Sequence, residues 1–154
     1  MKISGMFRAT IPAVIASTAL ALAGCETMNS AWDSTKSFFS GSNVTLSGDE
    51  EVPPVKTSAS GSGTITVKDD KSVSGSIKIT GATILAAHIH IGPAGRNGPV
   101  IIPLTKGSDG STFSVPAGRK LTDAQYEAYK AGNLYVNAHS AAYKGGEVRA
   151  QLKP

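Results

Sequence analysis

The three histidines of this 154-residue chain are its strongest candidates for chemistry. His88 and His90 lie in the run Ala87 to Gly92, and His139 ends a second strand-like run that begins at Leu134. Side chains two residues apart on a β-strand leave the same face about 6.5–7 Å apart along the backbone, so two imidazoles can converge on one ion. A third nitrogen arrives if the two runs are neighbouring strands. Three neutral imidazoles suit Cu(II) or Zn(II).

Other polar residues share the faces that carry the histidines. Tyr135 and Asn137 alternate with His139, and Glu147 begins the last predicted strand. Glu147 and Asn137 are therefore candidates for a fourth ligand or for hydrogen bonds to the ligating histidines. The alternative is a structural network without metal, in which the imidazoles bind Glu147, Asn137, Arg149 or loop carbonyls. The sequence leaves both interpretations open.

The remaining polar motifs indicate no catalytic residues. A Gly-x-Ser-x-Gly nucleophile motif is absent from the sequence, and no acid is placed to orient a histidine. The run Asp49-Glu50-Glu51 lacks a calcium-ligand pattern and is predicted to be solvated. Glu147 and Arg149 are predicted to form a surface pair or to anchor the last hairpin. We therefore expect a non-catalytic binding or structural module rather than an enzyme.

The first 25 residues are typical of an export signal. Lys2 and Arg8 precede an apolar stretch that ends in Leu22-Ala23-Gly24-Cys25. That ending resembles the lipobox of bacterial lipoproteins, in which the signal is cut before a cysteine that then receives lipid. The resemblance implies a signal peptide over residues 1–24 and a lipidated Cys25. Glu26, rather than Asp, follows the cysteine, which favours the outer membrane by analogy with enteric lipoproteins.

Composition limits the partners and the domain count. The chain has a formal net charge of +4, and removal of residues 1–24 takes away Lys2 and Arg8 and leaves +2. This weak charge argues against nucleic acid as a partner. The expected partners are the membrane, through the lipid anchor, and a protein of the cell envelope, on its periplasmic or surface side. Residues 25–42 are predicted to be a tether and residues 43–154 a single domain.

Hydrophobic alternation predicts an all-β domain. In the run 83–91 the odd positions Leu85, Ala87, Ile89 and Ile91 are apolar and are expected to face the core, opposite the histidines. About eight short strands separated by turn residues indicate an antiparallel β-sandwich. The predicted strands cover residues 43–47, 63–68, 72–80, 83–91, 100–104, 112–115, 133–139 and 147–152.

One segment instead has the signals of a helix. Thr122 and Gln125 have the spacing of a capping box, in which each side chain binds the backbone N–H of the other residue. Gly132 can adopt the left-handed conformation that ends a helix. These signals predict one short helix near residues 123–131, between two strands.

Five motifs follow one another along the chain: Leu46-Ser47-Gly48-x-x-Glu51-Val52-Pro53-Pro54-Val55, Ala87-His88-Ile89-His90-x-Gly92, Gly98-Pro99-Val100, Gly132-Asn133-Leu134-Tyr135-Val136-Asn137-x-His139 and Gly145-Gly146-Glu147-Val148-Arg149-x-Gln151-Leu152. Together, and in this order, they resemble the CHRD domain, a family named for the repeats of chordin. The resemblance covers about residues 44–152 and implies an immunoglobulin-like β-sandwich in a bacterial lipoprotein with a single such domain; growth-factor binding does not follow from the fold alone.

The His-x-His-x-Gly pattern is also similar to the copper-ligand strand of Cu,Zn superoxide dismutases. That dinuclear site needs more than three histidines and a disulfide, so dismutase activity is not expected.

Overall fold

The computed structural model describes residues 41–154. The predicted signal peptide, Cys25 and all but the last two residues of the predicted tether lie outside the described residues. Within the described part, the first strand already begins at Gly41, two residues before the predicted domain boundary. The described residues include no helix that is long and apolar enough to cross a membrane.

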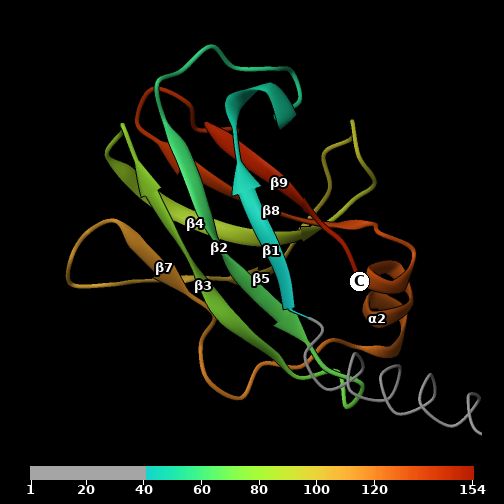
Figure 1. The fold of residues 1–154 in the computed structure, drawn as a ribbon. Coiled ribbons are helices and arrows are strands. Elements are labelled where there is room, and N and C mark those ends of the chain that lie inside the picture. Colours follow the sequence, from blue (N-terminus) through green and yellow to red (C-terminus); the bar gives the residue numbers. More distant parts are fainter. Residues whose placement is uncertain (1–40) are drawn as a thin grey trace, which may run out of the picture.

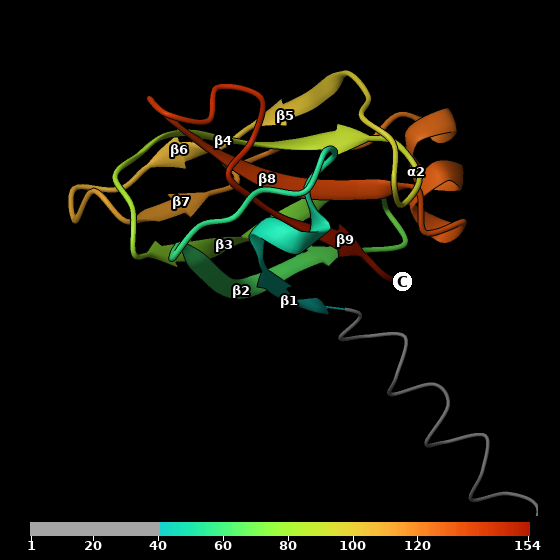
Figure 2. The ribbon, with the colours of Figure 1, turned by 90° about the horizontal axis from the view of Figure 1, so that it is seen from above.

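Two antiparallel sheets stack face to face, so the predicted β-sandwich is confirmed (Figures 1 and 2). One sheet has the strand order β1-β2-β3-β7-β6, and the other has the order β5-β4-β8-β9. The strands are β1 (Gly41–Leu46), β2 (Ser60–Val67), β3 (Val73–Thr80), β4 (Ile84–Ile91), β5 (Val100–Pro103), β6 (Thr105–Lys106), β7 (Thr112–Ser114), β8 (Leu134–Ser140) and β9 (Val148–Leu152). The two-residue strand β6 is not among the predicted strands.

The core lies between the two sheets, because each strand turns its apolar residues inward at every second position. Ile65 and Phe113 from one sheet and Val136, Leu134 and Leu152 from the other are completely buried. Full burial of a side chain of this size contributes roughly 1.5–3 kcal/mol to folding. The inner faces therefore hold the sandwich together, and the outer face of the β5-β4-β8-β9 sheet is left to carry polar residues.

The predicted helix forms where the capping signals placed it. Helix α2 (Asp123–Lys130) lies at one end of the sandwich, between β7 and β8 in the sequence (Figure 2). The Thr122 N–H donates to Gln125 Oε1 at 2.9 Å, and the Gln125 N–H donates to Thr122 Oγ1 at 3.3 Å. Gly132, just beyond the helix, has φ of 71°. Both ends of the predicted helix are thus confirmed.

The prediction that the Leu85 side chain in β4 faces the core is wrong. Its side chain is 59% exposed, whereas Ile84 is 1% exposed. The pairing of β4 with β8 shifts register between Ile84 and Ala86. Such a bulge inserts one unpaired residue, so the alternation of inward and outward side chains shifts by one position across it. After the bulge, Ala87 and Ile89 face the core as predicted, and the histidines lie on the opposite face.

Two connecting segments cover that opposite face. The segment after β1 contains the 3₁₀ helix η2 (Gly48–Glu50) and stays close to β9, because Ser47 and Arg149 exchange both backbone hydrogen bonds. The loop at residues 92–99 connects β4 to β5 and touches the first segment, since Asn97 Nδ2 donates to Val52 O at 2.7 Å. The polar face of the sheet is therefore partly closed off from solvent.

Because of the bulge, substitutions at two adjacent residues should differ strongly in their effect on the free energy of unfolding. Ile84→Ala should lower the free energy of unfolding by about 2–5 kcal/mol, because it leaves a cavity in the core. Leu85→Asn should change it by no more than about 0.5 kcal/mol, because that side chain faces water. Urea unfolding of the two variants and the parent measures both effects. A larger cost at Leu85 than at Ile84 would contradict the bulge.

Candidate metal centre

The pairing of β4 with β8 brings the three histidines together. In the register of these strands Ala86 faces His139, His88 faces Asn137, and His90 faces Tyr135. One nitrogen from each of His88, His90 and His139 can be chosen so that all three lie within 4.8 Å of one another. The convergence expected from the sequence therefore occurs, and it joins residues about fifty positions apart.

His90 presents a free nitrogen to this cluster. Its Nδ1 lies 2.9 Å from Gly98 O, and because a carbonyl can only accept, Nδ1 carries the proton. In the neutral ring the lone pair is then on Nε2. That atom is buried and has no hydrogen-bond partner among the described residues. A buried acceptor without a donor is uncommon in folded proteins and costs about 1–3 kcal/mol.

His139 is oriented in the same way by a different loop. Its Nδ1 donates to Lys144 O at 3.0 Å, which leaves the lone pair on Nε2. His88 Nδ1 lies 3.0 Å from that Nε2 and donates to it in the neutral, metal-free protein. Two of the three imidazoles are thus fixed as Nε2 lone-pair donors by backbone carbonyls, the usual means by which proteins orient metal-binding histidines.

The surroundings keep all three imidazoles neutral. Burial is the main cause that lowers the pKa of His88, His90 and His139 below the ordinary value of 6.5. A neighbouring imidazole lowers the pKa of His88 and of His139 further, and Arg149 has the same effect on His90. At neutral pH the cluster therefore offers lone pairs, which is the state that binds metal ions.

A stack of three side chains fixes the position of the His90 ring. The imidazole lies 4.7 Å from the Tyr135 ring at an interplanar angle of 9°. The Arg149 guanidinium lies 3.5 Å from the centroid of the same Tyr135 ring. Gly98 is bonded to both rings, because its N–H donates to Tyr135 Oη at 3.1 Å and its carbonyl accepts a hydrogen bond from His90 Nδ1. A Cβ at position 98 would lie 1.8 Å from Ile91 O, so only glycine fits.

Arg149 is buried rather than on the surface, which corrects the prediction of a surface pair. Its side chain is 1% exposed. The guanidinium donates to Pro93 O at 3.2 Å, to Arg96 O at 3.1 Å and to Asn97 Oδ1 at 3.3 Å. These bonds hold the 92–99 loop against the sheet. Arg149 therefore anchors the loop whose Gly98 carbonyl orients His90.

Glu51 is also buried, at 4% exposed, although its acidic run was predicted to be solvated. Its carboxylate lies against Gly146, where a Cβ would come within 2.3 Å of Oε1. Burial raises the pKa of Glu51 to about 6, while Arg149 and a hydrogen bond from Asn137 act in the opposite direction. A sequence pattern could not reveal this, because the burial arises when the segment after β1 folds over β9.

The two other predicted ligands occupy different positions. Glu147 is buried, but its Oε1 accepts a hydrogen bond from Thr57 Oγ1 at 2.6 Å, and no carboxylate joins the three histidines in the described part of the chain. Asn137 is 2% exposed and lies beside both His90 and Glu51. Its Oδ1 is, with Glu51 Oε1 and His90 Nε2, one of three buried acceptors without a partner among the described residues.

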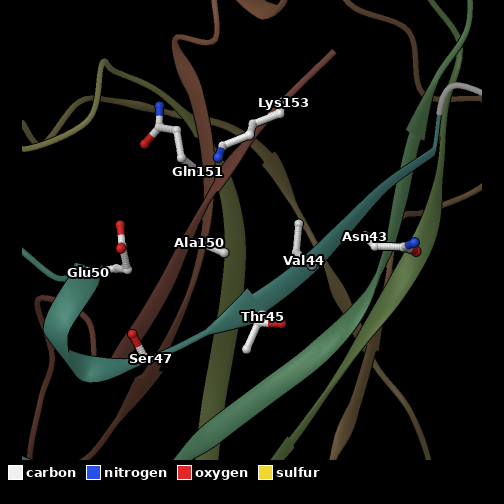
Figure 3. A pocket seen from close by; sticks show the side chains of 8 residues that line it. All are labelled: Asn43, Val44, Thr45, Ser47, Glu50, Ala150, Gln151 and Lys153. Carbon is white, nitrogen blue, oxygen red and sulfur yellow. The ribbon is translucent and has the colours of Figure 1, made fainter.

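A hollow elsewhere on the molecule does not include the histidines. It lies between β1 and β9, the edge strands of the two sheets (Figure 3). On one side of the hollow, Ser47 and Arg149 exchange backbone hydrogen bonds. On the other side, Ser42 Oγ donates to Lys153 O. It is lined by Asn43, Val44, Thr45, Ser47, Glu50, Ala150, Gln151 and Lys153.

The fold and the cluster together define a β-sandwich module with a candidate mononuclear metal centre on the outer face of one sheet. The family model of the CHRD domain matches residues 42–152. The chain belongs to the CHRD domain family, as the five motifs indicated. Neither a curated protein nor a solved structure gives a match.

The raised pKa of Glu51 predicts a pH-dependent effect of Glu51→Gln. Between pH 4.5 and about 6 the folded protein keeps a proton that the unfolded chain has lost, so the ionisation of Glu51 lowers stability as pH rises. The variant cannot ionise, so its stability relative to the parent should rise by about 2 kcal/mol from pH 4 to pH 7. Urea unfolding at each pH measures this. Glu50→Gln, at an exposed neighbour, is the matched control, and a pH-independent difference for Glu51→Gln would contradict the prediction.

Proposed function

We propose that the protein is a lipid-anchored, non-catalytic module of the cell envelope that binds one Cu or Zn ion. The ligands are His88 Nδ1, His90 Nε2 and His139 Nε2. The observation that carries this proposal is the buried Nε2 of His90, which has no hydrogen-bond partner among the described residues. A metal ion would satisfy that lone pair without any change in the Gly98 hydrogen bond that fixes the ring.

The alternative is a purely structural or protein-interaction module whose histidines form a hydrogen-bond network. The bonds from His139 to Lys144 O and from His88 to His139 support it. In that network His90 Nε2 would have to pair with Asn137, which lies beside it, but the nitrogen makes no hydrogen bond to the described residues, at a cost of about 1–3 kcal/mol. The metal centre accounts for all three rings, so we favour it.

The surroundings of the cluster support a non-catalytic role. The hydrogen bonds of the histidines in the described part of the chain go to backbone carbonyls and to one another. An activated nucleophile needs a hydroxyl or thiol beside a base, and the base needs an orienting group. The carbonyls of Gly98 and Lys144 orient the rings, but the described residues place no hydroxyl or thiol nucleophile in hydrogen-bond contact with them.

The proposed location depends on the N-terminal sequence. Lipid at Cys25 would anchor the module, and the buried CH₂ groups of several acyl chains would each contribute roughly 0.8 kcal/mol. Glu26 after the cysteine favours the outer membrane, on its periplasmic or surface side. There the domain would meet metal ions that enter the envelope and other envelope proteins.

Titration of the metal-free full chain with Cu(II) and Zn(II) tests the metal proposal. We expect micromolar or tighter binding, and His88→Ala and His139→Ala should each weaken it by more than about 100-fold, because each removes one of three ligands. Metal at about 100 times its dissociation constant should add about 2.7 kcal/mol to the free energy of unfolding of the parent. Calorimetry and urea unfolding provide the two measurements.

Leu85→Asn, at an exposed position on the same strand, is the matched control and should bind like the parent. Binding weaker than micromolar in the parent would contradict the metal centre and leave the hydrogen-bond network. Unchanged binding in both histidine variants would show that other residues hold the ion.

Replacement of the proposed lipidation site tests the anchor. Cys25→Ser should leave the precursor uncleaved and unlabelled by palmitate, because the lipid is attached to the thiol before cleavage. Metabolic labelling and the apparent mass of the chain measure both effects. The sequence has one cysteine, so thiol-linked label can only report on Cys25. A palmitate-labelled or normally processed variant would contradict the lipoprotein assignment.

A further inference from the structure

We infer that the histidine cluster selects Cu(II) over Zn(II), because its closest pair of nitrogens has the spacing of adjacent ligands in a tetragonal rather than a tetrahedral site. This inference rests on the proposed metal-binding function. Zn(II) sites in proteins are almost always tetrahedral, whereas Cu(II) favours square-planar and tetragonal sites. The spacing of the nitrogens therefore discriminates between the two ions.

The closest pair of nitrogens fits a right angle at the ion. His88 Nδ1 and His139 Nε2 are 3.0 Å apart. Two nitrogens at this separation, each about 2.0–2.1 Å from an ion, subtend about 91–97° at it. Tetrahedral ligands at the same bond length are about 3.3–3.4 Å apart. The observed pair matches two adjacent corners of a square.

The two rings that lie farthest apart are assigned to opposite corners of the same square. The His90 and His139 ring centroids are 6.2 Å apart, whereas His88 lies 5.6 Å from His90 and 4.8 Å from His139. His88 is thus the middle ligand. Nitrogens chosen one from each ring lie within 4.8 Å of one another, and opposite ligands of a square-planar ion are about 4.0–4.2 Å apart. A tetragonal ion needs less inward movement than a tetrahedral one.

The protein resists the movement that a tetrahedral ion would require. His90 and His139 are tied to the backbone of two different loops, at Gly98 O and Lys144 O. His90 is also stacked on Tyr135, which is itself held by Arg149. These contacts oppose a closer approach of His90 and His139, and a tetrahedral ion requires a larger approach than a tetragonal one.

The middle ligand is the adaptable one. His88 is partly exposed, and its hydrogen bond in the described structure is the one to His139. When an ion binds at His88 Nδ1, the proton on that nitrogen moves to Nε2 through solvent, and the ring remains neutral. The ion then replaces the proton between His88 and His139. Water completes the square, since no carboxylate of the described residues joins the group.

Spectroscopy of the metal-loaded full chain tests the geometry directly. Cu(II) should give an axial electron paramagnetic resonance spectrum with hyperfine splitting from imidazole nitrogens. About a hundredfold excess of Zn(II) should leave this spectrum unchanged. Co(II), bound in place of copper, should show the weak visible absorption of a site that is not tetrahedral. His88→Ala should change the copper spectrum or abolish it, and Leu85→Asn should leave it as in the parent.

The contrary outcomes separate this inference from the proposed function. Strong tetrahedral Co(II) bands, or displacement of copper by equimolar Zn(II), would overturn the copper preference while metal binding stands. Failure of both ions to bind would overturn the inference and the proposed function together. An unchanged copper spectrum in His88→Ala would overturn the assignment of the middle ligand.

Discussion

The buried guanidinium of Arg149 is the interaction on which the polar side of this sandwich depends. A charge that is 1% exposed must find partners, because an unpaired buried ion costs several kcal/mol. Arg149 finds them in the Pro93 and Arg96 carbonyls, the Asn97 side chain and the face of Tyr135. The 92–99 loop is therefore pulled down onto the sheet, and it covers a face that would otherwise be open to water.

The closure of that loop is also what gives the histidine cluster its chemical character. It places the Gly98 carbonyl where it accepts a hydrogen bond from His90 Nδ1, and it buries the opposite nitrogen without a donor. Burial lowers the pKa of the imidazoles, so they remain neutral and available to a metal ion. Stability and candidate function thus share residues: Tyr135 packs between Arg149, which holds the loop, and His90, which faces the cluster.

Much of the fold could be predicted, because its signals are local. Alternation of apolar residues indicated the strands, and the Thr122–Gln125 capping box placed the helix almost to the residue. The predicted inward orientation was wrong at Leu85, where a bulge shifts the pairing of β4 with β8. A bulge depends on how β4 pairs with its neighbour rather than on the sequence of β4 itself. Glu51 was misjudged for a similar reason: an acidic run usually faces water, and only the covering segment buries it.

The sequence by itself determined that His88 and His90 share a strand face opposite the core, because side chains alternate with a period of two. The tertiary structure alone decided that His139 meets them, since strand register joins residues far apart in the chain. It also decided which nitrogen of His90 and of His139 is free. Those choices are made by the carbonyls of Gly98 and Lys144, and every residue carries a carbonyl, so no pattern of side chains can reveal which one will be used.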